Sequence, residues 1–426
     1  MASGNETTYA AIDIGTTKIA TLVAKVSPTG TMQVVAVGHA TSEGMRKGMV
    51  VNPAELTESI RKSVQEAKSM LGFDIPTAHV GITGGHLTCI NTSVSLSQNG
   101  KGGVKAFSQA DVDRLLASTV DKSDNRRRIV HVVPQSYQVD GLRGVRDPIG
   151  MNGEQLAAES HVVVGDAATM EHLEQVVRAA GVKVHGIVIE HLASAEAVLT
   201  ADEREAGAVL VDIGGGTSDI AIYRDGAVWY TAAIPVAGHH FTNDIAIGLG
   251  LPPTVAEATK LRYGSASLDQ VGAHDVIEVE SGLGEHTRPI SHQTLNQLLH
   301  DRAVELVRMV LHKVRQSGLT KVPPGGIVLT GGCANLPGLV EIVADYGKCA
   351  VRIGTPSGTL GLPPELEHSS FSTAVGLLLW AIQHRHPGAV AESVTLDTNV
   401  LDRFKGWFSR LTPRRVTPPR VTEVRA

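Results

Sequence analysis

The stretch AAIDIGTTK at residues 10–18 has a counterpart in VLVDIGGGTSDI at residues 209–220, and this pair decides the fold. Each copy begins with an apolar run, reaches an Asp, turns through Gly and Thr, and continues into a second apolar run. A short apolar run bounded by turn residues is typical of a buried strand. Each copy therefore predicts a strand, a tight hairpin and a second strand.

Both hairpins have the composition of a phosphate-binding turn. Glycine permits positive φ and close backbone approach, so such turns can direct N–H groups at a phosphate. Two facing copies would hold one nucleotide from both sides. Asp13 and Asp212 would reach Mg²⁺ through water, because Mg²⁺ dehydrates reluctantly. A single copy would be weak evidence, since Asp-x-Gly-Thr is also ordinary turn chemistry.

A third element makes the pair specific. Residues 323–338, PPGGIVLTGGCANLPG, predict a strand that ends in a turn at Gly331 and Gly332. Bare backbone at that turn would let a flat base or sugar lie against it. In motif order the chain resembles actin, the sugar kinases and the heat-shock chaperones. That resemblance implies a bilobed α/β ATPase fold.

The composition indicates a protein with a large hydrophobic core, and its cysteines show no disulfide or zinc-binding pattern. Of 426 residues 42% are hydrophobic, and mean hydropathy is +0.04. Cys89, Cys333 and Cys349 fit neither an even disulfide framework nor a zinc-binding spacing, so we expect a reducing cytoplasm. The first eight residues lack the features of a signal peptide.

Charge is unevenly distributed along the chain. The net charge is −5, but residues 400–426 hold seven Lys or Arg and two acids, which leaves an acidic body and a basic tail. This balance argues against nucleic-acid binding by the body. The charge run at residues 125–128 predicts a solvated turn, and the adjacent His239 and His240 are predicted to lie on a strand and to be structural.

The tail predicts an amphipathic helix over residues 400–411. At 100° per residue its apolar side chains fall within an arc of about 120°, and polar or basic residues fill the rest. Aromatic and basic residues in this pattern favour a helix lying in a membrane interface, although docking on the body by the same face is the alternative. The membrane-facing residues would be Leu401, Phe404, Trp407, Phe408 and Leu411.

Changes in the pattern of apolar, polar and turn residues along the chain predict six units. They are a first ATPase lobe at 1–85 and 162–204, a small α+β subdomain inserted into it at 86–161, a second lobe at 205–240 and 321–383, a helix-rich insertion at 241–320, a linker at 384–399 and the tail at 400–426.

Over nearly its whole length the chain resembles the FtsA family of bacterial cell division proteins. The matching stretches are residues 13–18, 46–48, 131–135, 193–204, 211–222, 326–332 and 372–378, together with the tail. The resemblance implies an actin-like fold with one small subdomain replaced by an insertion elsewhere in the first lobe. It also implies ATP and Mg²⁺ binding, filament formation, capture of the tubulin-like protein FtsZ, contact with other division proteins, and peripheral attachment to the cytoplasmic face of the membrane at the division site.

The resemblance also assigns residues. The first phosphate loop would be Gly15, Thr16, Thr17 and Lys18; the second would be Gly214, Gly215, Gly216 and Thr217; Gly331 and Gly332 would form the adenosine loop. Glu257 and Lys260 would lie near ribose and adenine, or would form an ordinary exposed ion pair.

Catalytic and partner residues follow on the same basis. Glu190 resembles a water-orienting carboxylate and would act with Asp13 and Asp212; the alternative is a helix-start acid favoured by the dipole. Arg302 and Arg308 would suit the acidic C-terminal peptide of FtsZ.

Two other functions are compatible with the core motifs. One is a sugar or acetate kinase on the same fold, which needs a carboxylate base but no lipid-binding tail. The other is an FtsA-like pilus-assembly protein, which lacks the terminal amphipathic helix. Residues 400–411 therefore favour the membrane-attached filament protein, which would be at most a slow ATPase.

Overall fold

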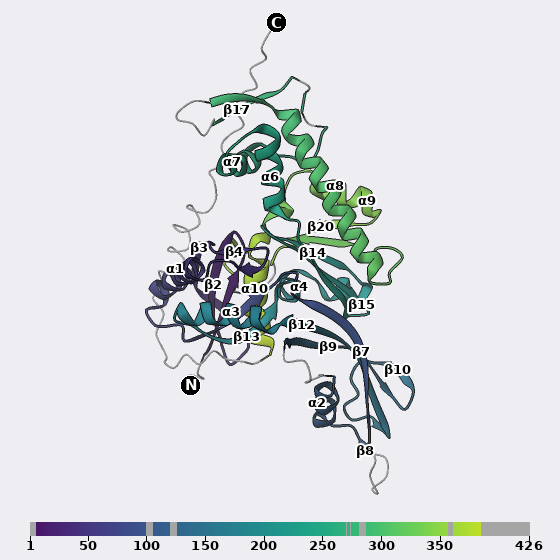
Figure 1. Ribbon diagram of the computed structural model, residues 1–426. Helices are drawn as coiled ribbons and strands as arrows, with labels where there is room; N and C mark the ends of the chain where they lie inside the picture. Colours follow the sequence, from purple (N-terminus) through teal and green to yellow (C-terminus); the bar gives the residue numbers. More distant parts are fainter. Residues whose placement is uncertain are drawn as a thin grey trace.

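The computed structural model describes residues 6–98, 105–119, 126–269, 271–272, 274–280, 287–356 and 361–384. Two five-stranded sheets and one four-stranded sheet organise this part of the chain (Figure 1). Figure 1 shows α6, α7 and β17 near one end of the molecule and α2 and β8 at the other.

The first large sheet has the strand order β13-β6-β1-β2-β3. β1 and β2 form an antiparallel hairpin, and β6 runs parallel to β1. Nearly all of β1 and β2 is buried, as expected for strands covered on both faces. The elements of this half are β1 (Thr7–Ile14), β2 (Lys18–Val26), β3 (Met32–Thr41), β4 (Met45–Arg46), β5 (Met49–Val50), α1 (Pro53–Leu71), β6 (Thr77–Ile82), α3 (Ala167–Ala179), β13 (Lys183–Ile189), α4 (Glu190–Val198) and α10 (Ser372–Gln383).

The second large sheet repeats this arrangement in the order β16-β15-β14-β19-β20. β14 and β15 form the hairpin, and β19 runs parallel to β14. The elements of this half are α5 (Ala201–Ala206), β14 (Val209–Ile213), β15 (Ser218–Arg224), β16 (Ala227–Ile234), α6 (Gly238–Leu249), α7 (Pro253–Tyr263), β17 (Val276–Glu280), β18 (Thr287–Ser291), α8 (His292–Gln316), β19 (Ile327–Thr330), η1 (Gly332–Asn335), α9 (Leu339–Gly347), β20 (Val351–Ile353), η2 (Pro364–Leu366) and η3 (Ser369–Phe371).

The four-stranded sheet, in the order β10-β9-β12-β7, has a small hydrophobic core of its own around Phe107, Leu115 and Leu156. Its β12 runs without a break across the limit expected between residues 161 and 162, so the domain limits stay a prediction. The elements are β7 (Thr88–Ser97), β8 (Lys105–Ala106), α2 (Gln109–Ala117), β9 (Arg127–Val139), β10 (Leu142–Val145), β11 (Asn152–Gly153) and β12 (Gln155–Asp166).

A bulge in β9 attaches this sheet to the second large sheet. Pro134 pairs with Ser160 and Ser136 with Glu159, so Gln135 has no partner on β12. The Nε2 of Gln135 donates instead to the carbonyls of Val228 (2.8 Å) and Trp229 (3.2 Å) on β16. His161 and Cys89 make further hydrogen bonds to Thr231 of β16, at 2.9 and 2.8 Å. The four-stranded sheet is therefore continuous with the first half in sequence and hydrogen-bonded to the second.

Two local expectations were wrong. His239 and His240 lie in the first turn of α6 and not on a strand. Arg127 and Arg128 begin β9, so the charge run is only partly a turn. Among the described helices, none has both the length and the apolar character needed to cross a bilayer.

Candidate functional site

The two predicted phosphate hairpins close in the same way. The N–H of Gly15 donates to the carbonyl of Lys18, and the N–H of Gly214 donates to the carbonyl of Thr217, each at 3.0 Å. Within the described part of the chain, the N–H groups of the intervening residues donate to no backbone carbonyl. These N–H groups are Thr16, Thr17, Gly215 and Gly216. They are available as donors to an anion.

The structure brings the tips of the hairpins into contact. A Cβ at Gly215 would lie 2.1 Å from the Oγ1 of Thr17, and a Cβ at Gly216 would lie 2.6 Å from the Oγ1 of Thr16. Only glycine fits these two positions without a shift of its neighbour. His239, which sequence reasoning dismissed, places its Nε2 3.4 Å from the Oγ1 of Thr17.

Carboxyl groups gather beneath the hairpins. Asp13, Asp212 and Asp219 are buried, at 5%, 7% and 3% exposure, and each carboxyl has a raised pKa, chiefly because of burial. The pKa of Asp13 and that of Asp219 rise to about 7. Asp219 was missed, although it lies inside the repeated stretch at residues 209–220. We call Asp13, Glu190, Asp212 and Asp219 the acid cluster.

Lys18 is the cation of the site. Burial lowers the pKa of its ammonium to about 8, against the opposing effect of Asp13 and Asp212. The ammonium lies 3.6 Å from the centroid of the Phe371 ring and donates to the carbonyl of Ser370. The four carboxyl groups outnumber this ammonium, and their mutual repulsion adds to the effect of burial in raising the pKa values of Asp13, Glu190 and Asp219.

Asp212 is held by two helices of the first half. Its Oδ2 accepts hydrogen bonds from the hydroxyls of Ser194 on α4 (2.5 Å) and Thr373 on α10 (3.1 Å). Those helices pack without space between them, since a Cβ at Gly376 would lie 1.8 Å from the carbonyl oxygen of Ala193. An aspartate on a strand of the second large sheet is therefore held in place by two helices of the first half of the molecule.

The predicted adenosine loop lies on the second hairpin. Gly331 has φ +87°, and a Cβ there would lie 2.4 Å from the Oδ1 of Asp212 and 2.6 Å from the carbonyl oxygen of Ile213. Its N–H donates to the carbonyl of Ser369 (3.2 Å). Gly332 opens η1 and is exposed.

Glu257 and Lys260 adjoin the same hairpin. The Nζ of Lys260 donates to the Oε2 of Glu257 (2.7 Å), the hydroxyl of Thr242 (2.9 Å) and the carbonyl of Gly238 (3.2 Å). Gly238 in turn donates to the carbonyl of Gly214 (3.0 Å). Lys260 is 9% exposed, which does not fit an ordinary exposed ion pair.

Glu190 begins α4 and belongs to the acid cluster. Burial, followed by the charges of Asp13, Asp219 and Asp212, raises its pKa well above the ordinary value. A Cβ at Gly81 would lie 3.0 Å from its Cγ. The raised pKa favours the protonated carboxyl, and general-base action would first require Glu190 to lose that proton. The described residues contain no group of three or more His, Cys, Asp or Glu arranged to hold a metal ion directly.

The predicted partner residues lie apart from this site. Arg302 of α8 donates to both carboxylate oxygens of Asp244 on α6 (2.6 and 2.8 Å) and pairs with Glu305. The guanidinium of Arg308 lies 5.8 Å from the ring centroid of Tyr346. The membrane-facing residues from Leu401 to Leu411 lie outside the described residues.

The raised pKa values predict an unusual dependence of stability on pH. An unfolded Asp titrates near 3.8, so between about pH 4 and about pH 7 Asp13 and Asp219 bind more protons in the folded protein than in the unfolded chain, and they lower the free energy of unfolding as pH rises. Buried histidines act in the opposite sense up to about pH 6.5, because burial lowers the pKa of His39, His131 and His161 to about 4 and that of His191 to about 3. We therefore expect the carboxyl contribution to show as a difference between the unmodified protein and a variant that lacks one of these carboxyl groups. Lys18 acts in the opposite sense only above about pH 8, because its folded pKa is lowered.

Asp219→Asn tests this origin, because it removes one of the two groups whose pKa reaches about 7. The Tm of this variant relative to that of the unmodified protein, measured by differential scanning calorimetry, should rise between about pH 4 and about pH 7, because only the unmodified protein loses the contribution of Asp219 over that range. A Tm difference that stays constant over this range would contradict the prediction.

Comparison with known proteins gives the same assignment along most of the chain. A family model described as "Cell division protein FtsA" matches residues 209–376, and one described as "SHS2 domain inserted in FTSA" matches residues 84–164. The chain is 38% identical over 404 residues to the cell division protein FtsA of Pseudomonas aeruginosa, covering 93% of this chain and 96% of the relative. It is 34% identical over 411 residues to the Escherichia coli K12 protein, covering 94% and 95%.

Solved structures with this fold are more distant in sequence. The PilM–PilN type IV pilus biogenesis complex matches with a TM-score of 0.64 at 16% identity, covering 88% of this chain and 98% of that chain. MreB5 of Spiroplasma citri bound to AMPPNP matches with a TM-score of 0.52 at 14% identity, covering 90% and 98%. The expected actin-like fold, with an inserted α+β subdomain, is confirmed.

Proposed function

Because this chain belongs to the FtsA family of bacterial cell division proteins, we propose that it binds ATP with Mg²⁺ between its two large sheets, assembles into filaments, and tethers FtsZ to the cytoplasmic membrane. The observation that carries the nucleotide part is the meeting of the two glycine hairpins above the acid cluster. The sugar-kinase and pilus-assembly alternatives are set aside because the chain belongs to the FtsA family. The structural likeness to PilM, at 16% identity, concerns the fold alone.

The residues present fit a magnesium nucleotide. The excess of carboxyl groups over ammonium groups favours a divalent cation, and water would bridge it to Asp13 and Asp212. The donors that remain on Thr16, Thr17 and Gly215 suit phosphate oxygens. Bound Mg²⁺ would supply charge neutralisation for the phosphates. The same fold holds AMPPNP in MreB5, which supports this use of the site.

Lys18 would be the residue that senses the phosphates. Its contacts with Ser370 and Phe371 compete with a phosphate for one ammonium, so nucleotide binding would release η3. η3 is bonded to Gly331 through Ser369, and the next residues begin α10. Phosphate binding would in this way reach the adenosine loop and α10 together.

The direct test is calorimetric titration of the full chain with MgATP, which should show one site per chain. No heat of binding up to millimolar ATP would contradict the nucleotide assignment. Any hydrolysis through Glu190 would first require its carboxyl group, whose pKa is raised by burial and by neighbouring carboxyl groups, to lose its proton.

The FtsZ contact is assigned to the α6–α8 region by family membership. Arg302 is already committed to Asp244, so Arg308 is the better candidate for an acidic peptide. We expect Arg308→Glu to weaken binding of the FtsZ C-terminal peptide by at least about fivefold at low salt, and less at high salt, because exposed charges are screened. Fluorescence anisotropy of the labelled peptide measures this.

Arg302→Glu is the comparison variant for that experiment. It breaks the ion pair between α8 and α6, so it should lower Tm. Unchanged peptide affinity in Arg308→Glu would remove Arg308 from the contact without affecting the rest of the proposal.

A further inference from the structure

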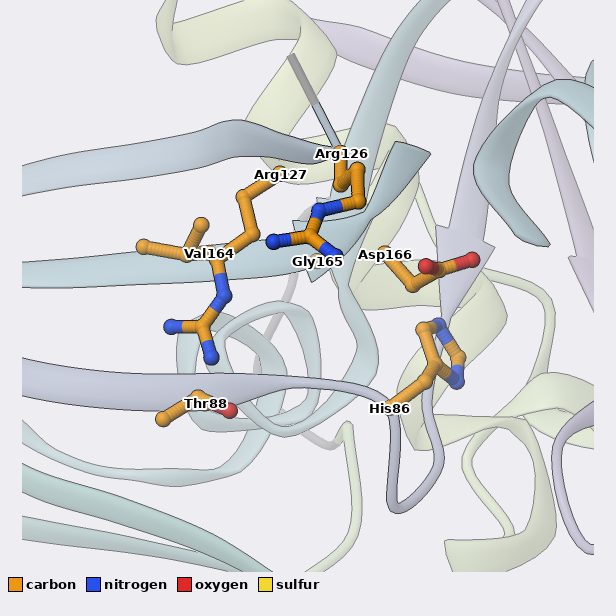
Figure 2. Close-up of a pocket in the computed structure, with 7 residues that line it drawn as sticks. All are labelled: His86, Thr88, Arg126, Arg127, Val164, Gly165 and Asp166. Carbon is orange, nitrogen blue, oxygen red and sulfur yellow. The ribbon is translucent and has the colours of Figure 1, made fainter. Parts of the chain in front are cut away.

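The cavity of about 370 Å³ that Figure 2 shows is lined by no residue assigned to the nucleotide site. Its charged lining residues are Arg126, Arg127 and Asp166, at one edge of the four-stranded sheet. These groups are committed within the protein: both arginines have interactions of their own, and Asp166 accepts two hydrogen bonds from Thr169 at 2.8 Å. A side chain that is open to a ligand and has no assigned role lies instead at the glycine hairpins, and it is His239.

The ring of His239 reaches both glycine hairpins. Its Nε2 lies 3.4 Å from the hydroxyl oxygen of Thr17 on the first hairpin and 3.6 Å from the place that a Cβ on Gly215 of the second hairpin would take. The backbone N–H of His239 donates to the carbonyl of Gly215 (2.8 Å), which fixes the start of α6 to the second hairpin. The ring therefore stands beside the backbone donors of Thr17 and Gly215 that are assigned to phosphate oxygens.

The ring of His239 is available to a ligand. The residue is exposed, whereas Asp13 and Asp212 beneath the hairpins are buried. The hydrogen bond between its Nε2 and Thr17 is long at 3.4 Å, and Nδ1 has no hydrogen-bond partner among the residues that the structure describes. A phosphate oxygen would offer Nε2 a shorter and stronger, charge-assisted bond than this hydroxyl does.

The surroundings of His239 favour a neutral ring in the absence of a ligand. Burial lowers the pKa of the imidazole; of the two charged groups that act on it from α7, Glu257 raises the pKa and Lys260 lowers it. The first hairpin presents the uncharged hydroxyl of Thr17. Cys333, packed against the start of α6, adds no charge near neutral pH, because burial raises the pKa of its thiol to about 11. A phosphate within hydrogen-bond distance would reverse this balance, since a nearby negative charge favours the imidazolium.

We propose that His239 binds a phosphate oxygen of the nucleotide where the two hairpins meet, and that the ring takes up a proton as it does so. The contact rests on the nucleotide binding proposed above and adds to it a side chain of the second half of the molecule. As an imidazolium the ring donates from Nε2 to the phosphate and places a positive charge beside it. Nucleotide binding is in this way linked to pH through one side chain.

Calorimetric titration of the full chain with MgATP tests the contact, with adenosine as a second probe that lacks phosphate. His239→Gln keeps a polar side chain but cannot become a cation, so it should bind MgATP at least about fivefold more weakly, as expected for the loss of a charge-assisted hydrogen bond. Its affinity for adenosine should be unchanged. Circular dichroism should show that the variant is folded.

His240→Gln is the matched control, because it removes the neighbouring imidazole of the same helix turn. The Nδ1 of His240 accepts from the N–H of Ala237 (3.2 Å), and glutamine at this third helical position can accept the same bond. This variant should bind MgATP and adenosine as the unmodified protein does.

The proton is measured by repeating the MgATP titration at about pH 7 in two buffers that differ in their heat of ionisation. The number of protons taken up per MgATP should be lower in His239→Gln than in the unmodified protein and in His240→Gln. Carboxyl groups of the acid cluster would release protons when Mg²⁺ binds, because the pKa values of Asp13 and Asp219 are about 7. That release is common to the three proteins, so it cancels in the difference.

Equal MgATP affinity and equal proton uptake in His239→Gln and His240→Gln would overturn the contact and leave nucleotide binding in place. The ring of His239 would then serve only to join the two hairpins. Weaker MgATP binding in His239→Gln with unchanged proton uptake would also overturn the proposal, because a neutral ring would then make the contact. Absence of MgATP binding in the unmodified protein would overturn the nucleotide site and this contact together.

Discussion

Gly215→Val should reduce MgATP affinity at least tenfold, equivalent to about 1.4 kcal/mol. A Cβ at this position lies 2.1 Å from the Oγ1 of Thr17, and the first hairpin would have to move to admit it. Rotation of Thr17 could accommodate the single methyl of alanine, but the branched side chain of valine also fills the space over the backbone donors. Overpacking of this kind typically costs 1–3 kcal/mol. Calorimetric titration with MgATP measures the change.

Gly85→Ala is the matched control for that experiment. A Cβ at Gly85 meets nothing within 4 Å, so neither folding nor ATP affinity should change. Equal ATP affinity in Gly215→Val and the unmodified protein, with both folded by circular dichroism, would show that the nucleotide does not enter between the hairpins.

Trp407→Glu should release the full chain from anionic vesicles and leave ATP binding unchanged. Burial of a large apolar side chain is worth roughly 1.5–3 kcal/mol at full burial and less at an interface. Phe404, Trp407 and Phe408 share the predicted apolar face, so Trp407→Glu removes one of three aromatic side chains and places a negative charge between the other two. Each basic residue nearby adds about 1 kcal/mol on an anionic surface. One tail is a modest anchor, and a filament with many tails would bind far more tightly.

Ser409→Glu separates burial from charge, because it adds the same negative charge to the polar face of the same predicted helix. Vesicle flotation should show strong loss for Trp407→Glu and a small loss for Ser409→Glu. Vesicle binding retained by Trp407→Glu at physiological salt would mean that this face docks on the protein and that the anchor lies elsewhere.

The local sequence predicted those helices and turns whose bounds are set by residues close to one another in the chain. Within the helix-rich insertion, residues 253–263 predict a helix, and α7 has the same bounds; both glycine hairpins also occur where the repeated stretch placed them. Residues 129–133 and 137–139 predict two short strands on either side of Pro134, and this was wrong, because the single strand β9 runs through the proline. The missing N–H of proline is tolerated there because the ladder already shifts register.

The roles of residues that act through tertiary contacts could not be predicted from the local sequence. Ser194 and Thr373 lie far from Asp212 in sequence and meet its carboxylate only when α4 and α10 pack together. The burial of Lys260 has the same origin, since the i,i+3 spacing with Glu257 is equally common on exposed helices. Asp219 needed only the observation that it follows the second hairpin directly. His239 lies beyond β16 and meets that hairpin only in the folded chain, where its N–H donates to the carbonyl of Gly215 (2.8 Å).

The bulged Gln135 has a mechanical consequence for the whole molecule. The four-stranded sheet continues from the first half of the chain, and Gln135 and His161 tie it to β16 in the second. The hydrogen bonds that Ser194 of α4 and Thr373 of α10 donate to Asp212 join the same two halves at another point. Separation of the two hairpins would therefore require either that the hydrogen bonds to β16 break or that the four-stranded sheet moves together with the second half. In the second case the outer end of that sheet, at α2 and β8, would be displaced farther than the hairpins, because it lies at the far end of the molecule (Figure 1).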